Sequence, residues 1–216
     1  MEKTFTADIP DISEQWYRDV VDVADSAPTP VQWFAVHFTE GVILLLGLLL
    51  VAVAVSRLRH ADPWGRALAL VAPAAVVLAY GCSEVLKSLV DEDRPCRGAV
   101  AILAGQCPPV GDWSFPSNHA TIAGALATAV LLLSPRWGLL AVPLALLAAL
   151  SRVFVGVHYP HDVLAGLLLG VAVTLLLAPL TARAVAGTLR RRGVPAGREP
   201  VPTAPGPAAE RDRAGH

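Results

Sequence analysis

Five long apolar runs limit what this chain can fold into more than any other feature of its sequence. They occupy residues 34–56, 66–83, 117–133, 137–155 and 162–184, and each approaches the ~20 residues that a helix needs to cross a bilayer. Residues 44–55 and 139–150 leave no polar face, which a helix of a soluble bundle would need. The sequence therefore predicts an all-α, polytopic membrane bundle of about five transmembrane helices.

The composition agrees with a membrane protein. Hydrophobic residues make up 54% and charged residues 16% of the 216 residues, whereas soluble domains have roughly 45–50% and 25%. The net charge is −1, so we expect no nucleic-acid partner. Residues 1–25 are acidic and lack an apolar central run, so we expect no cleavable signal peptide.

Arginines predict the orientation of the bundle. They lie between the first and second runs, between the third and fourth, and after the fifth, at Arg57, Arg59, Arg66, Arg136, Arg183 and Arg190–Arg192. All these positions fall on one side of the membrane, which the positive-inside rule makes cytoplasmic. We therefore expect an integral plasma-membrane protein with a cytoplasmic C-terminus, and with its N-terminus and remaining loops on the extracytoplasmic face.

The same patterns divide the chain into three segments. Residues 1–30 carry apolar side chains at helical spacing, with acids on the other face and Asp11 as a cap, which predicts an interfacial helix. The apolar positions are Ile9, Ile12, Trp16, Val20 and Val23. Residues 31–186 form the membrane core. Residues 187–216 are rich in Pro, Gly, Ala and charge, which predicts a disordered cytoplasmic tail.

Two of the three cysteines, Cys96 and Cys107, fall in the outer loop between the second and third runs. An oxidising exterior permits a disulfide there, which would stabilise the fold by ~2–3 kcal/mol; two free thiols are the alternative. Cys82 lies inside the second run and is expected to be a packing residue. No Cys–His cluster indicates zinc, so we expect no metal and no cofactor.

The first of three polar clusters contains Lys87 and Arg94, where the second run ends. The two cations are seven positions apart, so a continuous helix would project both from one face. Pro95 disfavours helix at Arg94, so we expect the chain to bend and return the guanidinium toward Lys87. These two groups suit the oxygens of a phosphoryl group; a pair of interface cations balanced by neighbouring acids is the alternative.

The second cluster, residues 116–119, directly precedes the third run. Ser117 is a natural helix cap, so free backbone N–H groups and the helix dipole are expected to form an anion site at its position. His119 lies in the first turn of that helix, where it is placed to give a proton to a leaving oxygen. An ordinary cap followed by an incidental interface histidine is the alternative.

In the third cluster, Ser151 and Arg152 end the fourth run, and His158 and Asp162 flank the start of the fifth. A carboxylate near an imidazole fixes its tautomer and leaves the other ring nitrogen free to attack. His161 competes with His158 for this role, but it adjoins Asp162, so we expect those two side chains to diverge. A helix-end pair of His158 and Asp162 without catalytic function is the alternative.

The three clusters fall on one membrane face, where ionisable groups are costly and usually functional. Together they resemble the signatures of the type 2 phosphatidic acid phosphatase superfamily, which shares its site with vanadium haloperoxidases. Residues 87–95 match Lys, six residues, Arg-Pro, and residues 151–162 match Ser-Arg, five residues, His, three residues, Asp. Residues 116–119 match Pro-Ser-Gly-His except that Asn118 replaces the glycine. The resemblance covers about residues 30–185.

The resemblance implies a double displacement without metal. His158 attacks phosphorus to form a phosphohistidine, and Asp162 orients it. His119 protonates the leaving oxygen and then, as a base, activates the water that hydrolyses the intermediate. The phosphate oxygens are expected to be held by the cations and helix-end groups of Lys87, Arg94, Arg152, Ser117 and Asn118.

A site at the membrane boundary implies a lipid phosphate or diphosphate as substrate. Short bacterial chains of this design resemble undecaprenyl-diphosphate phosphatases, which favours a polyprenyl diphosphate; phosphatidylglycerophosphate and phosphatidic acid are the alternatives. A non-catalytic lipid-phosphate binder or flippase is disfavoured, because binding alone needs no nucleophile. A haloperoxidase is disfavoured too, since that chemistry resides in soluble chains. Membrane lipids are a further expected partner, and the sequence gives no information on protein partners.

Overall fold

A computed structural model describes residues 11–98, 102–105 and 107–191. The described chain is all-helical, which confirms the predicted fold class. One short 3₁₀ helix, η1, covers Pro95–Arg97. The α-helices are α1 (Asp11–Ser26), α2 (Thr29–His60), α3 (Pro63–Val90), α4 (Asn118–Leu133), α5 (Pro135–Phe154) and α6 (Pro160–Arg191).

Five of these helices form the bundle, and four of them, α2, α3, α5 and α6, are long and apolar enough to cross a membrane. Polar residues at their ends continue the helices past the apolar runs, so α2 and α3 exceed the spans predicted at 34–56 and 66–83. Prolines favour helix starts because their missing N–H has no intrahelical partner there. Accordingly Pro63, Pro135 and Pro160 open α3, α5 and α6.

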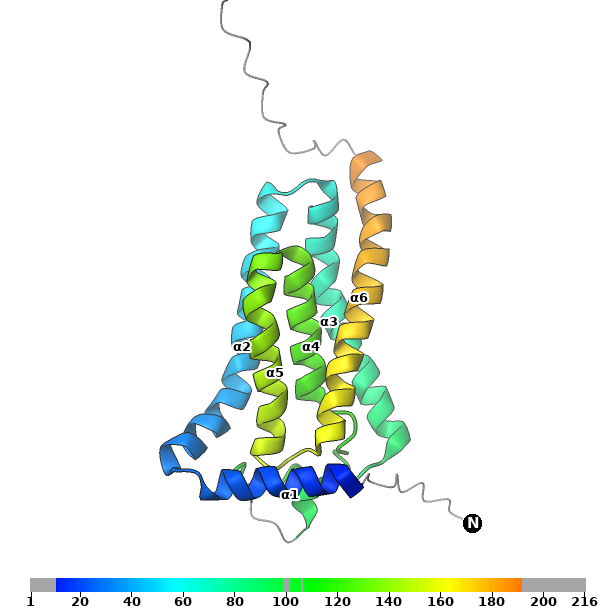
Figure 1. Cartoon of the computed structure of the whole chain (residues 1–216). Coiled ribbons are helices and arrows are strands. Elements are labelled where there is room, and N and C mark those ends of the chain that lie inside the picture. Colours follow the sequence, from blue (N-terminus) through cyan, green and yellow to red (C-terminus); the bar gives the residue numbers. More distant parts are fainter. Residues whose placement is uncertain (1–10, 99–101, 106, 192–216) are drawn as a thin grey trace, which may run out of the picture.

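The central helix, α4, has only 16 residues. At 1.5 Å per residue it spans ~24 Å, less than the ~30 Å of a bilayer core. It packs between the longer helices, and its N-terminus lies inside the bundle above α1 (Figure 1).

Close packing of α6 on α4 sets the position of that N-terminus. A Cβ atom on Gly166 would lie 2.4 Å from the Ser117 carbonyl oxygen, and one on Gly170 would lie 2.1 Å from that of Thr121. Only glycine permits this approach of two backbones. As a result the backbone N–H of Ser117 donates to the carbonyl of Asp162 at 3.0 Å, which joins the second and third sequence clusters.

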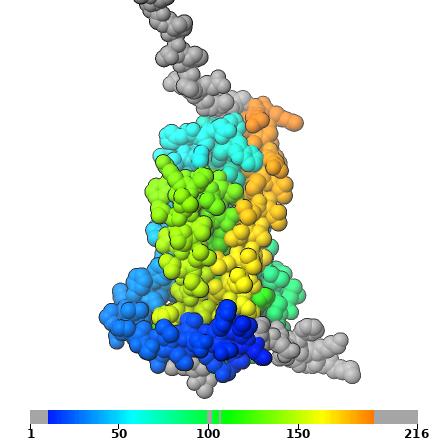
Figure 2. All heavy atoms as spheres, in the orientation of Figure 1, coloured from blue at the N-terminus to red at the C-terminus, as the bar shows by residue number. Residues whose placement is uncertain are grey.

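The N-terminal helix α1 lies across the end of the bundle and covers it (Figures 1 and 2). Its buried side chains are Ser13, Tyr17, Val21 and Ala24. The apolar stripe predicted from the sequence is on another face, where Ile12 and Trp16 are 58% and 57% exposed. The helix therefore presents its apolar stripe to the surroundings, as an interfacial helix does to lipid, and docks through a mixed face.

The opposite end of the bundle carries the arginines. Arg57 and Arg59 end α2, Arg136 begins α5, and α6 ends at Arg191, all at the end farthest from α1 (Figure 1). Helix α6 thus continues past residue 187, where we expected a tail to begin, because residues 187–191 extend its helical pattern. Residues 192–216 lie outside the described part of the chain.

Candidate active site

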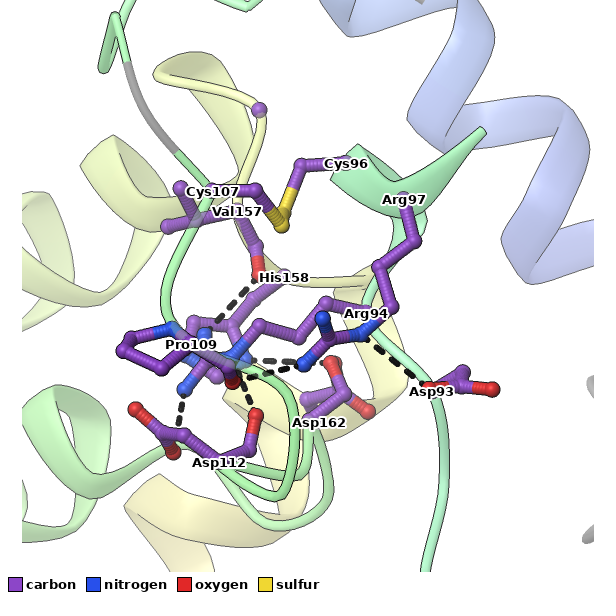
Figure 3. The surroundings of a disulfide bond; sticks show 12 residues. Asp93, Arg94, Cys96, Arg97, Cys107, Pro109, Asp112, Val157, His158 and Asp162 are labelled. Atoms are coloured by element: carbon purple, nitrogen blue, oxygen red, sulfur yellow. Dashed lines mark hydrogen bonds and ion pairs between the residues drawn. A yellow bond between two sulfur atoms is a disulfide. The ribbon is translucent and has the colours of Figure 1, made fainter. Parts of the chain in front are cut away.

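At the end of the bundle that α1 covers, side chains of the first and third sequence clusters are in direct contact. The imidazole of His158 projects from the turn of residues 155–159, and its side chain is only 2% exposed. Its Nε2 lies 2.9 Å from Nη1 of Arg94. Its Nδ1 lies 3.3 Å from Oδ2 of Asp162 in the first turn of α6. Figure 3 shows Arg94, His158 and Asp162 below the disulfide.

These contacts determine the tautomer of His158. A guanidinium has only donors, so Nε2 must accept from Arg94. An ionised carboxylate only accepts, so Nδ1 must carry the proton that Asp162 binds. The unprotonated Nε2 is therefore the nitrogen that faces the cations, in the state that a nucleophile requires.

Asp162 is held in place by several further contacts. Its Oδ2 accepts the backbone N–H of Tyr159 at 2.8 Å and a hydrogen bond from the Ser114 hydroxyl. The carboxylate side chain is completely buried. Ser114 and Tyr159 therefore fix the carboxylate that binds His158.

The electrostatics keep His158 neutral. Burial lowers its pKa to about 4, and the positive charges of Arg94 and Arg152 act in the same direction, whereas the hydrogen bond to Asp162 opposes them. A histidine with this pKa is unprotonated at neutral pH. A neutral imidazole can act as a nucleophile without losing a proton first.

Lys87 and Arg94 meet as predicted from the bend at Pro95, and they meet on a carboxylate that the sequence did not indicate. Oδ1 of Asp112 lies 2.8 Å from Nζ of Lys87 and 2.9 Å from Nη2 of Arg94. Figure 3 shows Asp112 beside Arg94. The backbone carbonyl of Asp112 also accepts from Nε of Arg94 at 2.8 Å. Both cationic side chains are buried, whereas the Asp112 side chain is 45% exposed.

Burial alone would raise the pKa of Asp112, but its hydrogen bonds to Lys87 and Arg94 outweigh this and hold the pKa below its ordinary value. The carboxylate is therefore an anion bound to the two cations next to Nε2 of His158. A phosphoryl oxygen would make the same kind of contact with them. We call Lys87, Arg94, His158 and Asp162, with Asp112, the nucleophile half of the site.

Two other predicted residues, His119 and Arg152, form a second group with Glu40, which we call the acid half. Nε2 of His119, in the first turn of α4, lies 2.9 Å from Oε1 of Glu40 on α2. Nη1 of Arg152, at the end of α5, lies 3.3 Å from the same oxygen and 3.1 Å from Oγ1 of Thr39. The histidine is 27% exposed and the glutamate 68%.

The N-terminus of α4 confirms the predicted cap. Oγ of Ser117 accepts the backbone N–H of Ala120 at 3.5 Å. The backbone N–H groups of Asn118 and His119 precede the first intrahelical hydrogen bond and belong to the anion-binding end of the helix. Ser117 thus contributes through the helix end that it caps.

Asn118 differs from the expectation. Its side-chain Oδ1 accepts from the Ser83 hydroxyl at 2.7 Å, and its Nδ2 donates to Glu84. Both partners belong to α3, because the first turn of α4 packs on that helix. The amide is satisfied there, so we assign the phosphate contact of Asn118 to its backbone N–H rather than to its side chain.

His161 also differs from the expectation. Its Nε2 lies 3.0 Å from Oε1 of Glu92 and 3.2 Å from Oδ1 of Asp162. The prediction that His161 and Asp162 diverge was therefore wrong, because Glu92 of the preceding loop draws the imidazole toward the carboxylate. Glu92, His161 and Asp162 are close enough together to hold a cation. Both ring nitrogens of His161 already have partners, Glu92 and Ser13, so we assign no metal to them.

The disulfide lies directly beside Arg94. The structure joins Cys96 to Cys107, with Cα atoms 5.6 Å apart, and Figure 3 shows the bridge above the guanidinium. Cys96 is buried at 9% exposure. Because Arg94 is two residues before Cys96, the bridge restrains the backbone that carries this guanidinium.

Sequence reasoning missed Glu40, Glu92, Asp112 and Ser114. Glu40 carried a usable signal, since it is an acid within a predicted span, and such residues are usually functional. Glu92 lay among other loop acids, and nothing in the sequence distinguished it from Asp91. Asp112 and Ser114 lie in an irregular loop, where spacing carries no information on direction.

Comparisons with known proteins agree with this geometry. The PAP2 superfamily model matches residues 68–185, more than half of the chain. An undecaprenyl-diphosphatase of Sulfolobus acidocaldarius is 41% identical over 95 residues, 44% of this chain and 46% of that protein. The chain therefore matches less than half the length of this relative.

A decaprenylphosphoryl-5-phosphoribose phosphatase of Mycobacterium tuberculosis is 39% identical over 140 residues, 63% of this chain and 71% of that protein. The crystal structure of Aquifex aeolicus LpxE shares the fold, with a TM-score of 0.60 at 22% identity over 79% of this chain and 97% of that chain. The extent of the family match, together with the 39% identity to a relative most of whose length is covered, shows that this chain belongs to the PAP2 superfamily.

Proposed function

We propose that the protein hydrolyses a lipid phosphate or diphosphate through a phosphohistidine on His158. The observation that carries the proposal is the unprotonated Nε2 of His158, 2.9 Å from Arg94 and next to a carboxylate held by Lys87 and Arg94. A nucleophile beside an anion-binding pair of cations is the arrangement that phosphoryl transfer needs. A binder or flippase has no use for the nucleophile.

In the first step a phosphoryl group replaces the Asp112 carboxylate on Lys87 and Arg94. The hydrogen bond from Arg94 to His158 then passes to a phosphoryl oxygen, which frees the Nε2 lone pair. Nε2 attacks phosphorus, and the bond from phosphorus to the leaving oxygen breaks. His119 gives its proton to that oxygen, and Asp162 stabilises the positive charge on the phosphohistidine ring.

In the second step the products are inorganic phosphate and the regenerated enzyme. His119, now neutral, takes a proton from water, and the water oxygen attacks phosphorus. The bond between phosphorus and Nε2 breaks, and the electron pair returns to His158. The cations of Lys87, Arg94 and Arg152 hold the equatorial oxygens in both steps. The chain's own groups therefore stabilise the negative charge of the transition state.

An apolar groove supports a lipid substrate. It has a volume of about 930 Å³ and is lined by side chains of α1, α2, α5 and α6, among them Trp16, Phe34, Phe38 and Leu150. Ser151 also lines it, and the Ser151 hydroxyl donates to Thr39, which accepts from Arg152 in the acid half. We assign the groove to the hydrocarbon tail, which leaves the headgroup at the cations.

Among lipid phosphates we favour a polyprenyl phosphate or diphosphate, because the two relatives described above act, by their names, on undecaprenyl and decaprenyl compounds. The test is phosphate release by the detergent-purified chain from undecaprenyl diphosphate, phosphatidylglycerophosphate and phosphatidic acid, each with and without EDTA. We expect fastest release from the polyprenyl substrate, and equal rates with EDTA. Faster release from a glycerophospholipid overturns the substrate, and loss of all activity in EDTA overturns the metal-free mechanism.

The groove is tested with Leu150→Trp. The larger side chain should raise KM for undecaprenyl diphosphate and leave the hydrolysis of p-nitrophenyl phosphate unchanged. Leu139→Trp is the matched control, since Leu139 also lies on α5, is 75% exposed and does not line the groove. Equal changes in KM for undecaprenyl diphosphate in both variants would show that the groove does not bind the hydrocarbon tail.

We further propose that the site faces the exterior and the arginine-rich end faces the cytoplasm, as the positive-inside rule predicts. The test is labelling of intact cells with an impermeant thiol reagent on a Cys82→Ser background. Val110→Cys in the loop beside the site should label, since Val110 is 88% exposed. His60→Cys at the far end of α2 should not label, and the reverse pattern would place the site in the cytoplasm.

A further inference from the structure

The surroundings of His161 are not explained by the mechanism above. Its imidazole joins three parts of the molecule. Nδ1 lies 2.7 Å from Oγ of Ser13 on α1, and Nε2 lies 3.0 Å from Glu92 in the loop after α3 and 3.2 Å from Asp162. Asp162 is the same carboxylate that binds His158.

Glu92 is an unusual residue for this location. Its side chain is 5% exposed, and burial followed by the nearby charge of Asp162 raises its pKa, although the hydrogen bond from His161 opposes the rise. A buried carboxylate is costly unless a donor satisfies it. It also adds negative charge near a site that binds anions. Its one side-chain partner in the described chain is His161.

The donors and acceptors around His161 show how it acts on Asp162. Ionised carboxylates only accept, so Nε2 of His161 must carry the proton that Glu92 binds, and this N–H group lies 3.2 Å from Oδ1 of Asp162. Oδ1 of Asp162 accepts no hydrogen bond from the described residues and has the His161 imidazole as its ion-pair partner. Oδ2 takes Ser114, Tyr159 and His158. His161 is therefore the group that holds the second oxygen.

Helix α1 also makes two contacts with the turn of residues 155–159, which carries His158. The hydroxyl of Tyr17 donates to the carbonyl of Gly156 at 3.0 Å, and the ring of Tyr17 meets that of Tyr159 edge to face at 5.4 Å between centroids. Gly156 and Tyr159 bracket His158 in the sequence. The interfacial helix is thus bound directly to the segment that carries the nucleophile.

We propose that Ser13, Glu92 and His161 are positioning residues for phosphoryl transfer. His161, held from one side by Ser13 and from the other by Glu92, fixes the carboxylate of Asp162 and, through it, the ring of His158. The proposal makes the docking of α1 a condition for full catalytic rate. It rests on the phosphatase function proposed above.

The test uses full-length, detergent-purified variants and the lipid phosphate of the panel that the wild type hydrolyses fastest. Ser13→Ala, Glu92→Gln and His161→Ala should each lower kcat, by about tenfold to hundredfold for His161→Ala, because a displaced reacting group costs that much. KM should stay within about twofold, since the phosphate ligands are untouched. His161→Gln should recover part of the loss, because its amide N–H can replace the Nε2 proton.

A double variant of Ser13 and His161 distinguishes a positioning role from general destabilisation of the fold. If the three residues act through one ring, Ser13→Ala should cost nothing further on the His161→Ala background. Three matched controls should keep the wild-type kcat: Ser26→Ala at the other end of α1, His37→Ala on the exposed face of α2, and Asp93→Asn, whose partner is Arg97. Melting temperatures show that each variant is folded, and the two conservative variants keep the test open if His161→Ala fails to fold.

Unchanged kcat in Ser13→Ala and Glu92→Gln would overturn the positioning role, as would losses that add in the double variant. A higher KM at unchanged kcat would overturn it too, because that result indicates a substrate contact. Absence of phosphatase activity in the wild type itself would instead defeat the function on which the inference rests. These two failures are therefore distinguished by the wild-type measurement alone.

Discussion

The two halves of the site hold their histidines in opposite ways. In the nucleophile half, His158 is 2% exposed and its carboxylate partner is fully buried. In the acid half, His119 is 27% exposed and its partner Glu40 is 68% exposed. One histidine is enclosed by protein on all sides, and the other stays in contact with solvent.

The difference corresponds to the two chemical tasks. A nucleophile must present one nitrogen in one direction, and a fixed tautomer in a buried network achieves this. An acid that later becomes a base must exchange its proton with the leaving group and with water, so it needs access and a mobile partner. The burial of each histidine therefore fits the role that we propose for it.

The largest expected effect is in the nucleophile half. His158→Ala should abolish turnover and phosphoenzyme formation, because the partners of His158 provide no second nucleophile. The measurement is a quench of the enzyme and a ³²P-labelled substrate in alkaline detergent, followed by detection of base-stable, acid-labile label on the protein. Label that persists in His158→Ala would place the nucleophile elsewhere and remove the comparison.

The acid half should respond differently. His119→Ala is expected to lower kcat on a lipid substrate by about 10²–10⁴-fold, the usual contribution of general acid–base catalysis. With p-nitrophenyl phosphate, whose leaving group needs no proton, the phosphoenzyme should still form and should accumulate because its hydrolysis lacks a base. A loss of the same size for good and poor leaving groups would mean that His119 is not the acid.

Asp112 tests whether the nucleophile half must be vacated before substrate binds. Asp112→Asn should lower the inhibition constant of orthovanadate by about tenfold, or ~1.4 kcal/mol, because Lys87 and Arg94 lose a competing anion. Asp91→Asn is the control, since Asp91 is exposed at the end of α3 and asparagine tolerates its positive φ. An unchanged vanadate constant would mean that the carboxylate does not compete for the cations.

Asp112 also shows how far the sequence could lead. The helices followed from apolar runs, and Lys87, Arg94, His158 and Asp162 from spacing and resemblance, because those patterns repeat with the geometry of helices and caps. Asp112 acts from an irregular loop that folds back on cations 18 and 25 positions away. No local period encodes such a return, so only the folded chain reveals it.

Helix α1 is a second case in which the sequence predicted only part of the structure. Its helical spacing was visible, and the prediction of an interfacial helix followed from it. Which face docks was decided by two hydroxyl groups, Ser13 and Tyr17, whose partners His161 and Gly156 lie 148 and 139 positions away. Hydrophobic periodicity describes what a helix can bury, whereas specific hydrogen bonds select what it does bury.

A smaller effect is expected at the disulfide, which restrains Arg94 in the nucleophile half. Cys96→Ser or Cys107→Ser should lower the free energy of unfolding by ~2–3 kcal/mol and kcat by about twofold to threefold through looser placement of the guanidinium. The double variant should be no worse than either single one, and Cys82→Ser should have no effect. Recovery of Cys96 and Cys107 as free thiols from protein purified without reductant would contradict this.

The last prediction is that the rate of phosphoenzyme formation does not change with pH over a range in which a free histidine gains a proton. Burial lowers the pKa of His158 to about 4 from the ordinary 6.5, so the folded nucleophile stays neutral where a free histidine would gain a proton. Phosphoenzyme formation from p-nitrophenyl phosphate, measured by rapid quench on the His119→Ala background, should therefore be constant from pH 7 down to pH ~5.5. Folding stability should change over the same range: the unfolded chain binds a proton at His158 below pH 6.5 and the folded chain does not, so stability is lost as the pH falls from 6.5 toward 4. A rate that halves near pH 6.5 in this variant would show that His158 titrates like an exposed histidine, and the contrast between a sealed nucleophile and an open acid would then no longer hold.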